Sequence, residues 1–273
     1  MRFDDLDRKM REYERSMDQA LPKDRFLVAR LDGRGFTRLT KEICPDLERP
    51  FDQRFNDAMV ATVSHLFHSG FEVVYGYTQS DEISLLFAYG ASTFELKSRK
   101  FLSILAGEAS AAFTQAFGHI GVFDCRMIPL PDLDAVADYF RWRQEDSNRN
   151  SLNAYVYWTL RDEGMSAREA DRQLLSISNE KKRSILTERG IDYESVPRWQ
   201  RWGVGVYNVR VERKGLNPKT GKEETGFGNA LKVDRDLPLR EDYVALVKST
   251  LQPSINREEH RHRWAASSQK KTM

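Results

Sequence analysis

The first 130 residues alternate between short apolar runs and longer segments whose apolar residues recur at helical spacing. The short runs predict four strands, at 26–31, 71–77, 82–89 and 122–130. The longer segments predict two amphipathic helices, at 50–68 and 93–117. This order of strand, helix, strand, strand, helix, strand is that of the ferredoxin-like fold, whose antiparallel sheet can carry two helices on one face. We therefore predict an α+β fold class with a ferredoxin-like (βαββαβ) domain over 1–130, which begins with a charged helix at 3–17.

The second half of the chain follows a different pattern. Residues 132–190 are almost wholly helical in pattern, with breaks expected near Asn148–Ser151 and at Gly164. Beyond Pro197, Trp202–Arg213 reads as a strand that runs into a hairpin or loop. We expect a mostly helical region over 131–255 that completes the functional unit, followed by a polar, frayed tail at 256–273.

Composition excludes several classes of protein. The chain has 273 residues, of which 40% are hydrophobic and 31% charged, and its two cysteines, Cys44 and Cys125, form no CxxC pair. A disulfide framework and a structural zinc site are therefore not expected. No signal peptide and no apolar run of ~18 residues is visible, so a cytoplasmic location is predicted. The net charge of +2 does not by itself indicate a nucleic-acid partner.

Two aspartates are placed close together by this topology. Asp32 follows the first predicted strand and Asp81 precedes the third, and these two strands are central neighbours in a ferredoxin-like sheet. Converging carboxylates suit Mg²⁺, and two ions ~3.5–4 Å apart support phosphoryl chemistry. Each aspartate alone is better explained as a turn residue, because Asp-Gly and Ser-Asp are common turn dipeptides. As a pair, they favour a metal site.

The run Asp32–Phe36 (DGRGF) adds to this interpretation. Its two glycines allow a close approach of backbone to a ligand, and consecutive N–H groups there can bind an anion. The chain contains no GxxxxGK[ST] motif, and a lone GxG is not a dinucleotide fingerprint.

Three motifs together resemble the tRNA-histidine guanylyltransferase family: Leu31–Phe36 (LDGRGF), Gln79–Glu82 (QSDE) and Trp142–Asp146 (WRQED). Their order and spacing agree with that family from about Phe3 to Tyr207. The resemblance implies a 3′-to-5′ polymerase with a catalytic domain similar to a polymerase palm, which adds nucleotides to the 5′ end of tRNA with ATP or GTP as substrates. It also implies a homotetramer built as a dimer of dimers.

The resemblance assigns roles to residues at matching positions. Asp32, Asp81 and the carbonyl of Gly33 would hold two Mg²⁺ ions, with both aspartates catalytic. The nucleotide triphosphate would be cradled by Asp32, Gly33, Arg34, Gly35, Phe36, Thr37, Ser80 and Asp81. Further contacts to the triphosphate or the tRNA are implied for Arg30, Arg49, Asp52, Glu82, Lys97, Lys100, Asn148, Asn150 and Lys181. Whether Glu82 touches metal or supports Asp81 stays open.

Two positions depart from the eukaryotic members, which have histidine where this chain has Thr37 and Asn148. Both departures resemble the bacterial and archaeal branch, which repairs truncated tRNA 5′ ends by templated addition. Guanosine addition to tRNA-His is the alternative within the family. Outside it, a palm-type nucleotidyl cyclase is disfavoured by the basic helices of the second half. A non-catalytic RNA-binding protein is disfavoured by the two intact aspartates.

Overall fold

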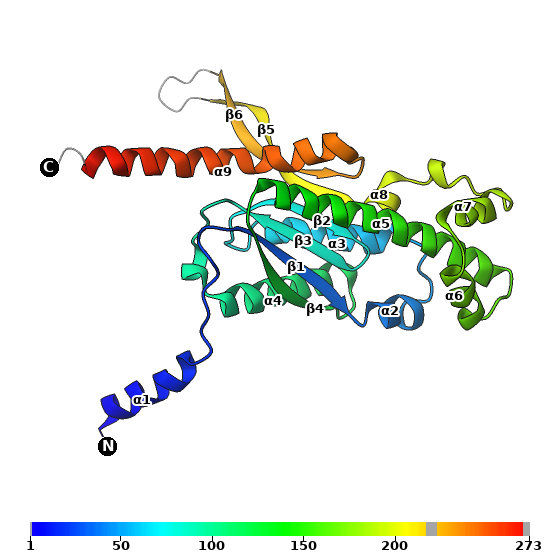
Figure 1. The fold of residues 1–273 in the computed structure, drawn as a ribbon, viewed down its shortest axis with the longest axis horizontal. Coiled ribbons are helices and arrows are strands. Elements are labelled where there is room, and N and C mark those ends of the chain that lie inside the picture. The colour runs from blue at the N-terminus through cyan, green and yellow to red at the C-terminus, as the bar shows by residue number, and fades with distance from the viewer. Residues whose placement is uncertain (1, 217–222, 270–273) are drawn as a thin grey trace.

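One six-stranded antiparallel sheet forms the centre of the protein in the computed structural model, which describes residues 2–216 and 223–269 (Figure 1). The strand order is β4-β1-β3-β2-β5-β6. The strands are β1 (Phe26–Arg34), β2 (Val73–Gln79), β3 (Glu82–Phe87), β4 (Val122–Leu130), β5 (Val204–Leu216) and β6 (Glu223–Asp234). The first four have the ferredoxin-like order, with β1 and β3 as central neighbours, so the predicted fold class is confirmed.

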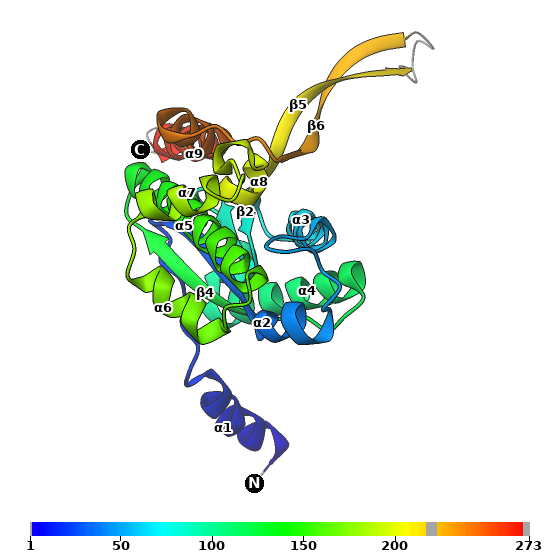
Figure 2. The same cartoon turned by 90° about the vertical axis from the view of Figure 1, so that its right-hand side faces the viewer.

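Helices cover both faces of this sheet. Helices α3 (Gln53–Leu66) and α4 (Ser98–Phe117) lie on one face, and α5 (Leu133–Asp162) and α9 (Arg240–Gln269) lie on the other (Figures 1 and 2). The first core lies between the sheet and helices α3 and α4, and the second core lies between the sheet and helices α5 and α9. In β1, Leu27, Ala29 and Leu31 belong to the first core, while Val28 belongs to the second. A strand buried on both faces is apolar at almost every position, which is why the β1 segment reads as a continuous apolar run.

The long helix α5 is continuous where a break was expected. Its helical conformation runs through Asn148–Ser151, so that expectation is wrong. Asn and Ser side chains often interrupt helices by bonding to the backbone. Here Asn150 donates to Asp146, and the side-chain oxygen of Asn148 accepts from the Tyr193 hydroxyl, so neither amide competes with the helix. The expected break at Gly164, which has a φ of 93°, does follow the helix end.

The smaller helices complete the C-terminal half. They are α6 (Ala167–Leu175), α7 (Asn179–Thr187) and α8 (Arg198–Trp202), and α6 and α7 pack against the end of α5 in a third core. The expected strand after Pro197 begins only at Val204, and it pairs with β2 through Tyr75 and Tyr207. Strands β5 and β6 form a hairpin that projects from the body (Figure 2), and residues 217–222 lie outside the described residues.

The C-terminal segment is helical where a frayed tail was expected. Helix α9 continues through Asn256 to Gln269, so that expectation is wrong as far as residue 269. Buried residues at four-residue spacing, Tyr243, Val247 and Leu251, fix the helix against the sheet, and partly buried Ile255 continues the stripe. Within the described ranges, no helix is long and apolar enough to cross a membrane.

Two boundaries differ from the sequence prediction in ways that shape the site. β1 extends to Arg34, so the DGR residues belong to the strand, and the β2–β3 turn consists of Ser80 and Asp81 alone. The helix predicted from residue 93 becomes regular at Ser98, because the φ angles of Phe94, Glu95 and Leu96 are 52°, 55° and 59°.

Candidate active site

The two aspartates meet at one end of the central strand pair. β1 and β3 are paired so that Asp32 stands opposite Glu82, and Asp81 is the residue before Glu82. The backbone N–H of Gly33 donates to the carbonyl oxygen of Asp81 at 3.0 Å. The structure therefore brings Asp32 and Asp81 together at the edge that the topology predicted.

The carboxyl of Asp81 is electrostatically strained without a cation. Burial raises the pKa of Asp81 above its ordinary value, and the nearby charge of Asp32 raises this pKa further. The Ser80 hydroxyl donates to Oδ1 of Asp81 at 3.2 Å and opposes that rise. Two carboxylates that repel each other at a partly desolvated edge fit a divalent cation, whose charge would stabilise both.

A metal at this edge would need ligands beyond the two carboxylates. In the described residues, no group of three or more His, Cys, Asp or Glu side chains is arranged to hold a metal ion. Mg²⁺ usually takes one or two carboxylates and completes its shell with waters and substrate phosphates. The donor set of Asp32, Asp81 and neighbouring backbone carbonyls therefore fits Mg²⁺ and does not resemble a closed structural metal site.

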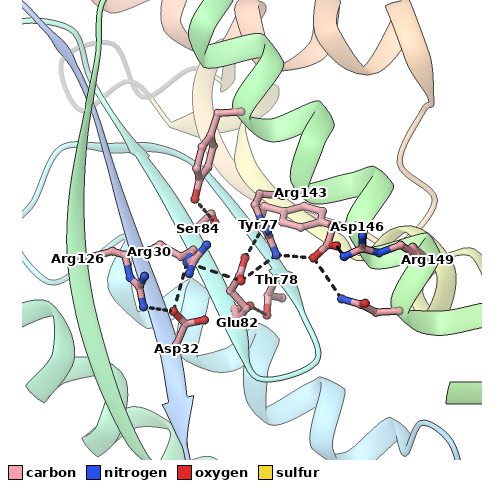
Figure 3. Close-up of polar contacts among 12 residues, drawn as sticks. Arg30, Asp32, Tyr77, Thr78, Glu82, Ser84, Arg126, Arg143, Asp146 and Arg149 are labelled. Atoms are coloured by element: carbon pink, nitrogen blue, oxygen red, sulfur yellow. Dashed lines mark hydrogen bonds and ion pairs between the residues drawn. The ribbon is translucent and has the colours of Figure 1, made fainter. Parts of the chain in front are cut away.

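Two arginines hold the carboxylate of Asp32. The Nε of Arg30 and an Nη of Arg126 donate to its Oδ2 at 3.2 and 3.0 Å (Figure 3). Arg30 is two residues from Asp32 on β1, and Arg126 comes from the neighbouring strand β4, where it is the register partner of Arg30. Ligation of a metal by this oxygen would require at least one of these arginines to move.

The glycine-rich loop is shaped by a buried phenylalanine. Gly35 has a φ of 74°, which favours glycine, and Phe36 begins the short helix α2 (Phe36–Arg38). The Phe36 ring is buried, with its centroid 4.9 Å from that of Phe113 and 5.1 Å from that of Phe123. A Cβ at Gly33 would lie 2.5 Å from the Phe36 ring. Phe36 thus fixes the loop from beneath, whereas Thr37 is exposed.

A cavity of about 210 Å³ opens beside this loop. Among the residues implied by the family resemblance, its lining contains Phe36, Thr37, Arg49, Asp52, Ser80 and Asp81. The other lining residues are Thr40, Lys41, Leu47, Glu48, Pro50, Phe51, Phe55, Asn56, Trp158 and Trp199. Segments from both halves of the chain therefore form one cavity, and Asp81 is part of its lining.

The aromatic and basic residues of this cavity contact one another. The guanidinium of Arg49 lies over the Trp158 ring, 4.6 Å from its centroid, and donates to the carbonyl of Thr40 at 2.7 Å. The ammonium of Lys41 lies 5.6 Å from the centroid of the same ring. Such an arrangement offers positive charge for phosphates beside a flat apolar surface for a base.

Asp52 has a structural role in the wall of the cavity. Its carboxylate caps α3 by accepting from the Arg54 N–H at 2.7 Å, and it also accepts from the Glu48 N–H at 2.8 Å. Hydrogen bonding from Arg54 lowers the pKa of Asp52 to about 2. These bonds hold the loop before α3 in place, so we assign Asp52 to positioning of the loop.

Glu82 belongs to a chain of charged side chains, in which its Oε2 lies 3.8 Å from the Nε of Arg30. Arg143 on α5 donates to both of its carboxylate oxygens, at 2.7 and 2.9 Å, and to Asp146 at 3.0 Å (Figure 3). Arg149 also pairs with Asp146. Burial raises the pKa of Glu82, and the charges of Arg143 and Arg30 oppose this rise. Glu82 therefore links the turn that carries Asp81 to the WRQED segment.

A second cavity of about 300 Å³ lies along α5 and α7. Its lining residues are Trp142, Glu145, Asp146, Asn148, Arg149, Leu152, Asn179 and Arg183. The side-chain oxygen of Asn148 accepts from the Tyr193 hydroxyl at 3.1 Å, which orients this amide. Asn150 lies on α5 and donates to Asp146 at 3.2 Å, so it supports the wall of this cavity.

Three lysines implied by the resemblance lie outside the linings of both cavities. Lys97, at the N-terminal end of α4, pairs with Glu95 at 2.9 Å. Lys100 lies on the same first turn of α4. Lys181 lies on α7, 3.7 Å from Glu188. None of the three lines either of the two cavities.

Sequence reasoning missed several residues of the site. Neither the pairing of Arg126 with Asp32 nor the pairing of Arg143 with Glu82 was expected, and Lys41 and Trp158 were not singled out. In the sequence, Arg126 is one of several residues that would face outward from a predicted strand, and nothing distinguishes it from the others. Only the register of β4 on β1 places it beside Asp32. Trp158 falls within the helical pattern of α5, where an aromatic residue indicates only a packed face.

Two family models and several curated relatives match this chain. A family model described as tRNAHis guanylyltransferase matches residues 7–131, and one described as Thg1 C terminal domain matches residues 134–269. The tRNA(His) guanylyltransferase of Debaryomyces hansenii is 29% identical over 199 residues, covering 68% of this chain and 74% of that protein. The enzyme of the same name from Schizosaccharomyces pombe is 29% identical over 198 residues, covering 69% and 74%.

Solved structures give the same result over a larger share of the chain. A bacterial tRNA(His) guanylyltransferase (Thg1)-like protein in complex with ATP has a TM-score of 0.70 and 26% identity, covering 90% of this chain and 99% of that one. The complex of such a protein with GTP has a TM-score of 0.69 and 25% identity over the same shares. This chain belongs to the tRNAHis guanylyltransferase (Thg1) family and is a nucleotidyltransferase.

Proposed function

We propose that this protein adds nucleotides to the 5′ end of a tRNA and that Asp32 and Asp81 form the metal-binding centre of the reaction. The observation that carries this proposal is the pairing of β1 with β3, which brings Asp32 beside Asp81, and Asp81 lines a cavity with basic and aromatic walls. The names of the curated relatives and the ATP and GTP complexes of similar bacterial proteins support it.

The proposed reaction has two steps. In the first, an oxygen of the tRNA 5′-monophosphate attacks the α-phosphate of ATP or GTP, and pyrophosphate leaves. In the second, the 3′-hydroxyl of an incoming nucleoside triphosphate attacks the activated 5′-phosphate, and the nucleoside monophosphate leaves. Two Mg²⁺ ions, held by Asp32, Asp81 and the Gly33 carbonyl, would lower the pKa of the attacking hydroxyl and neutralise triphosphate charge.

The residues of the chain would contribute position and charge. Ser80 and Thr37 line the cavity with hydroxyl groups beside Asp81, where a triphosphate would lie. Lys41 and Arg49 would neutralise phosphate oxygens, while Trp158 would offer its ring to the base. Catalysis of this kind comes from orientation and electrostatic stabilisation, without a covalent enzyme intermediate.

Within this chemistry we propose templated 3′-to-5′ repair of shortened tRNA ends. The observation that favours it is Asn148, which stands where the family resemblance expects a histidine in the guanosine-adding members. The names of the curated relatives favour the alternative, guanosine addition to tRNA-His. We also propose a cytoplasmic homotetramer, on the basis of the family resemblance.

An addition assay tests the function. The protein is incubated with Mg²⁺, labelled nucleotides and a tRNA that lacks its first 5′ nucleotide, with intact tRNA-His in parallel. We expect the missing nucleotide to be added, and Asp32→Ala and Asp81→Ala to lose that addition while the exposed Asp134→Ala keeps it. Unchanged addition by the two aspartate variants would contradict the assigned site. Cyclic nucleotide as the product, or tRNA binding without addition, would favour the cyclase or the non-catalytic RNA-binding alternative.

A further inference from the structure

The N-terminal helix α1 (Phe3–Arg15) stands apart from the rest of the molecule. It projects from the body in both views (Figures 1 and 2), and none of its residues is buried. Its ion pairs, Arg8 with Asp5 and Arg11 with Asp7, stay within the helix. A 13-residue helix with no packed face is only marginally stable in water, so α1 requires a partner surface.

The base of α1 is fixed to the body. The linker residue Gln19 accepts through its carbonyl from the N–H of Ser98 at 2.8 Å, and the N–H of Leu21 donates to the carbonyl of Leu96 at 2.8 Å. The Leu21 side chain is buried in the first core. The helix is therefore presented at a defined place on the body.

One side of α1 carries an exposed apolar stripe. Phe3, Leu6, Met10 and Tyr13 on the helix are 78%, 40%, 43% and 66% exposed, and Met17, in the turn after the helix ends at Arg15, is 81% exposed. They recur at alternating intervals of three and four residues, which is the spacing of the a and d positions of a coiled coil. The stripe is the surface that a second helix of the same pattern would cover.

The charges beside the stripe select the partner and its direction. With Phe3 and Met10 at a positions, Lys9 is a g residue and Glu14 an e residue. In a parallel pair a g residue meets the e residue five positions later on the other helix. Lys9 then meets Glu14 in both directions across the pair. In an antiparallel pair the acidic residues would face each other, and so would the basic ones.

We propose that α1 is a self-association helix, which pairs in parallel and in register with α1 of a second copy of this chain. The N-terminus lies at the tip of α1, away from the body (Figure 1), so a parallel pair places both bodies at the same end. The helical pair covers only about two heptads. It therefore supplies one association step and acts together with contacts elsewhere on the body. This proposal does not rest on the proposed activity.

Sedimentation of the full chain tests the pairing. We expect Leu6→Asp/Met10→Asp to lose one association step, so that the mass at low micromolar concentration falls by half. Arg8→Gln/Arg15→Gln changes the net charge equally at positions off the stripe, and it should keep the parent mass. Circular dichroism and the melting temperature check that the body stays folded. Equal masses for the parent and the stripe variant, or loss of tRNA binding at unchanged mass, would overturn the proposal.

Two further variants test the direction. Phe3→Cys should form a disulfide-linked dimer under mild oxidation, because equivalent a positions are neighbours in a parallel pair; the parent, with buried Cys44 and partly buried Cys125, is the blank. A link between Phe3→Cys and Tyr13→Cys chains in preference to Phe3→Cys homodimers would show an antiparallel pair and overturn this part. Lys9→Glu should weaken association, and Lys9→Glu/Glu14→Lys should restore it.

Discussion

At the scale of single residues, Gly33 illustrates how packing and function act on the same position. The sequence alone explains a glycine here by the room that a ligand needs. In the structure, however, a Cβ added to Gly33 would lie 2.5 Å from the Phe36 ring, which supplies the nearest atoms. Phe36 in turn is held by other aromatic rings and cannot withdraw freely. The requirement for glycine therefore exists before any nucleotide binds.

We expect Gly33→Ala to destabilise the protein by about 1–3 kcal/mol, because overpacking forces a buried ring or the backbone to shift. The free energy of unfolding from urea titration measures this effect. Gly107→Ala is the control, since its Cβ would meet open space on α4 and should stabilise by about 0.5–1 kcal/mol. A Gly33→Ala protein as stable as the parent would show that the end of β1 and the Phe36 ring relax without cost.

Asp81 is a second residue at which function opposes stability. Its pKa is raised in the folded state by burial first and by Asp32. Protonation of Asp81 therefore stabilises the folded protein. This contribution to the free energy of unfolding is fully present below the ordinary pKa of 3.8, and it is lost as the pH rises through the raised pKa of the folded state.

Asp81→Asn should therefore be more stable than the parent at pH 7 without metal, and the gain should vanish below the unfolded pKa of about 3.8. Nucleotide addition should fall by about a hundredfold or more, because a ligand for the cation is lost. Chemical denaturation at several pH values in EDTA measures the first effect. Equal stability of the two proteins at pH 7 would contradict the strain assigned to Asp81.

At the scale of elements, α5 connects the parts of the site. Arg143 binds Glu82 at the β2–β3 turn, Trp142 and Asn148 line the second cavity, and Trp158 lines the first. The helix reaches all of these because it is an unbroken element of 30 residues across one face of the sheet. A break near Asn148 would have separated Arg143 from Trp158.

The Arg143–Glu82 pair should be the costliest ion pair of α5 to break. We expect Arg143→Ala to destabilise by about 3–5 kcal/mol, since the largely buried carboxylate of Glu82 loses both hydrogen bonds from Arg143 and keeps Arg30, at 3.8 Å, as an ion-pair partner. Arg141→Ala, on the exposed side of α5, should cost less than about 1 kcal/mol. Adding Glu82→Gln to Arg143→Ala should recover part of the loss. Strict additivity in this double-mutant cycle would rule out a direct coupling.

At the scale of the whole molecule, the two segments matched by the family models share one structure. The boundary between them falls between residues 131 and 134, but β5 pairs with β2, and α5 and α9 cover the second face of the sheet. Val28, Tyr75 and Leu86 in the first segment are fully buried only because the second segment packs on them.

A fragment of residues 1–131 should therefore not form a stable monomer, because it exposes this apolar face and the edge of β2. We expect strong binding of a hydrophobic dye and aggregation on gel filtration. Co-expression with residues 132–273 should reduce both effects. A monomeric fragment with cooperative unfolding and no dye binding would show that the first half folds on its own.

The sequence by itself determined the order of the strands and the two helices on one face, and through that order the meeting of Asp32 with Asp81. These features depend on local periodicity and on a small set of allowed topologies, both of which can be read along the chain. Asp32 remained ambiguous as a single residue, because a turn and a metal ligand have the same local pattern.

Only the tertiary structure decided which side chains surround the two aspartates. Arg126 reaches Asp32 through the register of β4, and Arg143 reaches Glu82 through the packing of α5 on the sheet. The same packing kept α5 whole at Asn148 and extended α9 past Asn256. Such contacts join residues far apart in sequence, so their geometry depends on the whole assembled core, which local propensity does not contain.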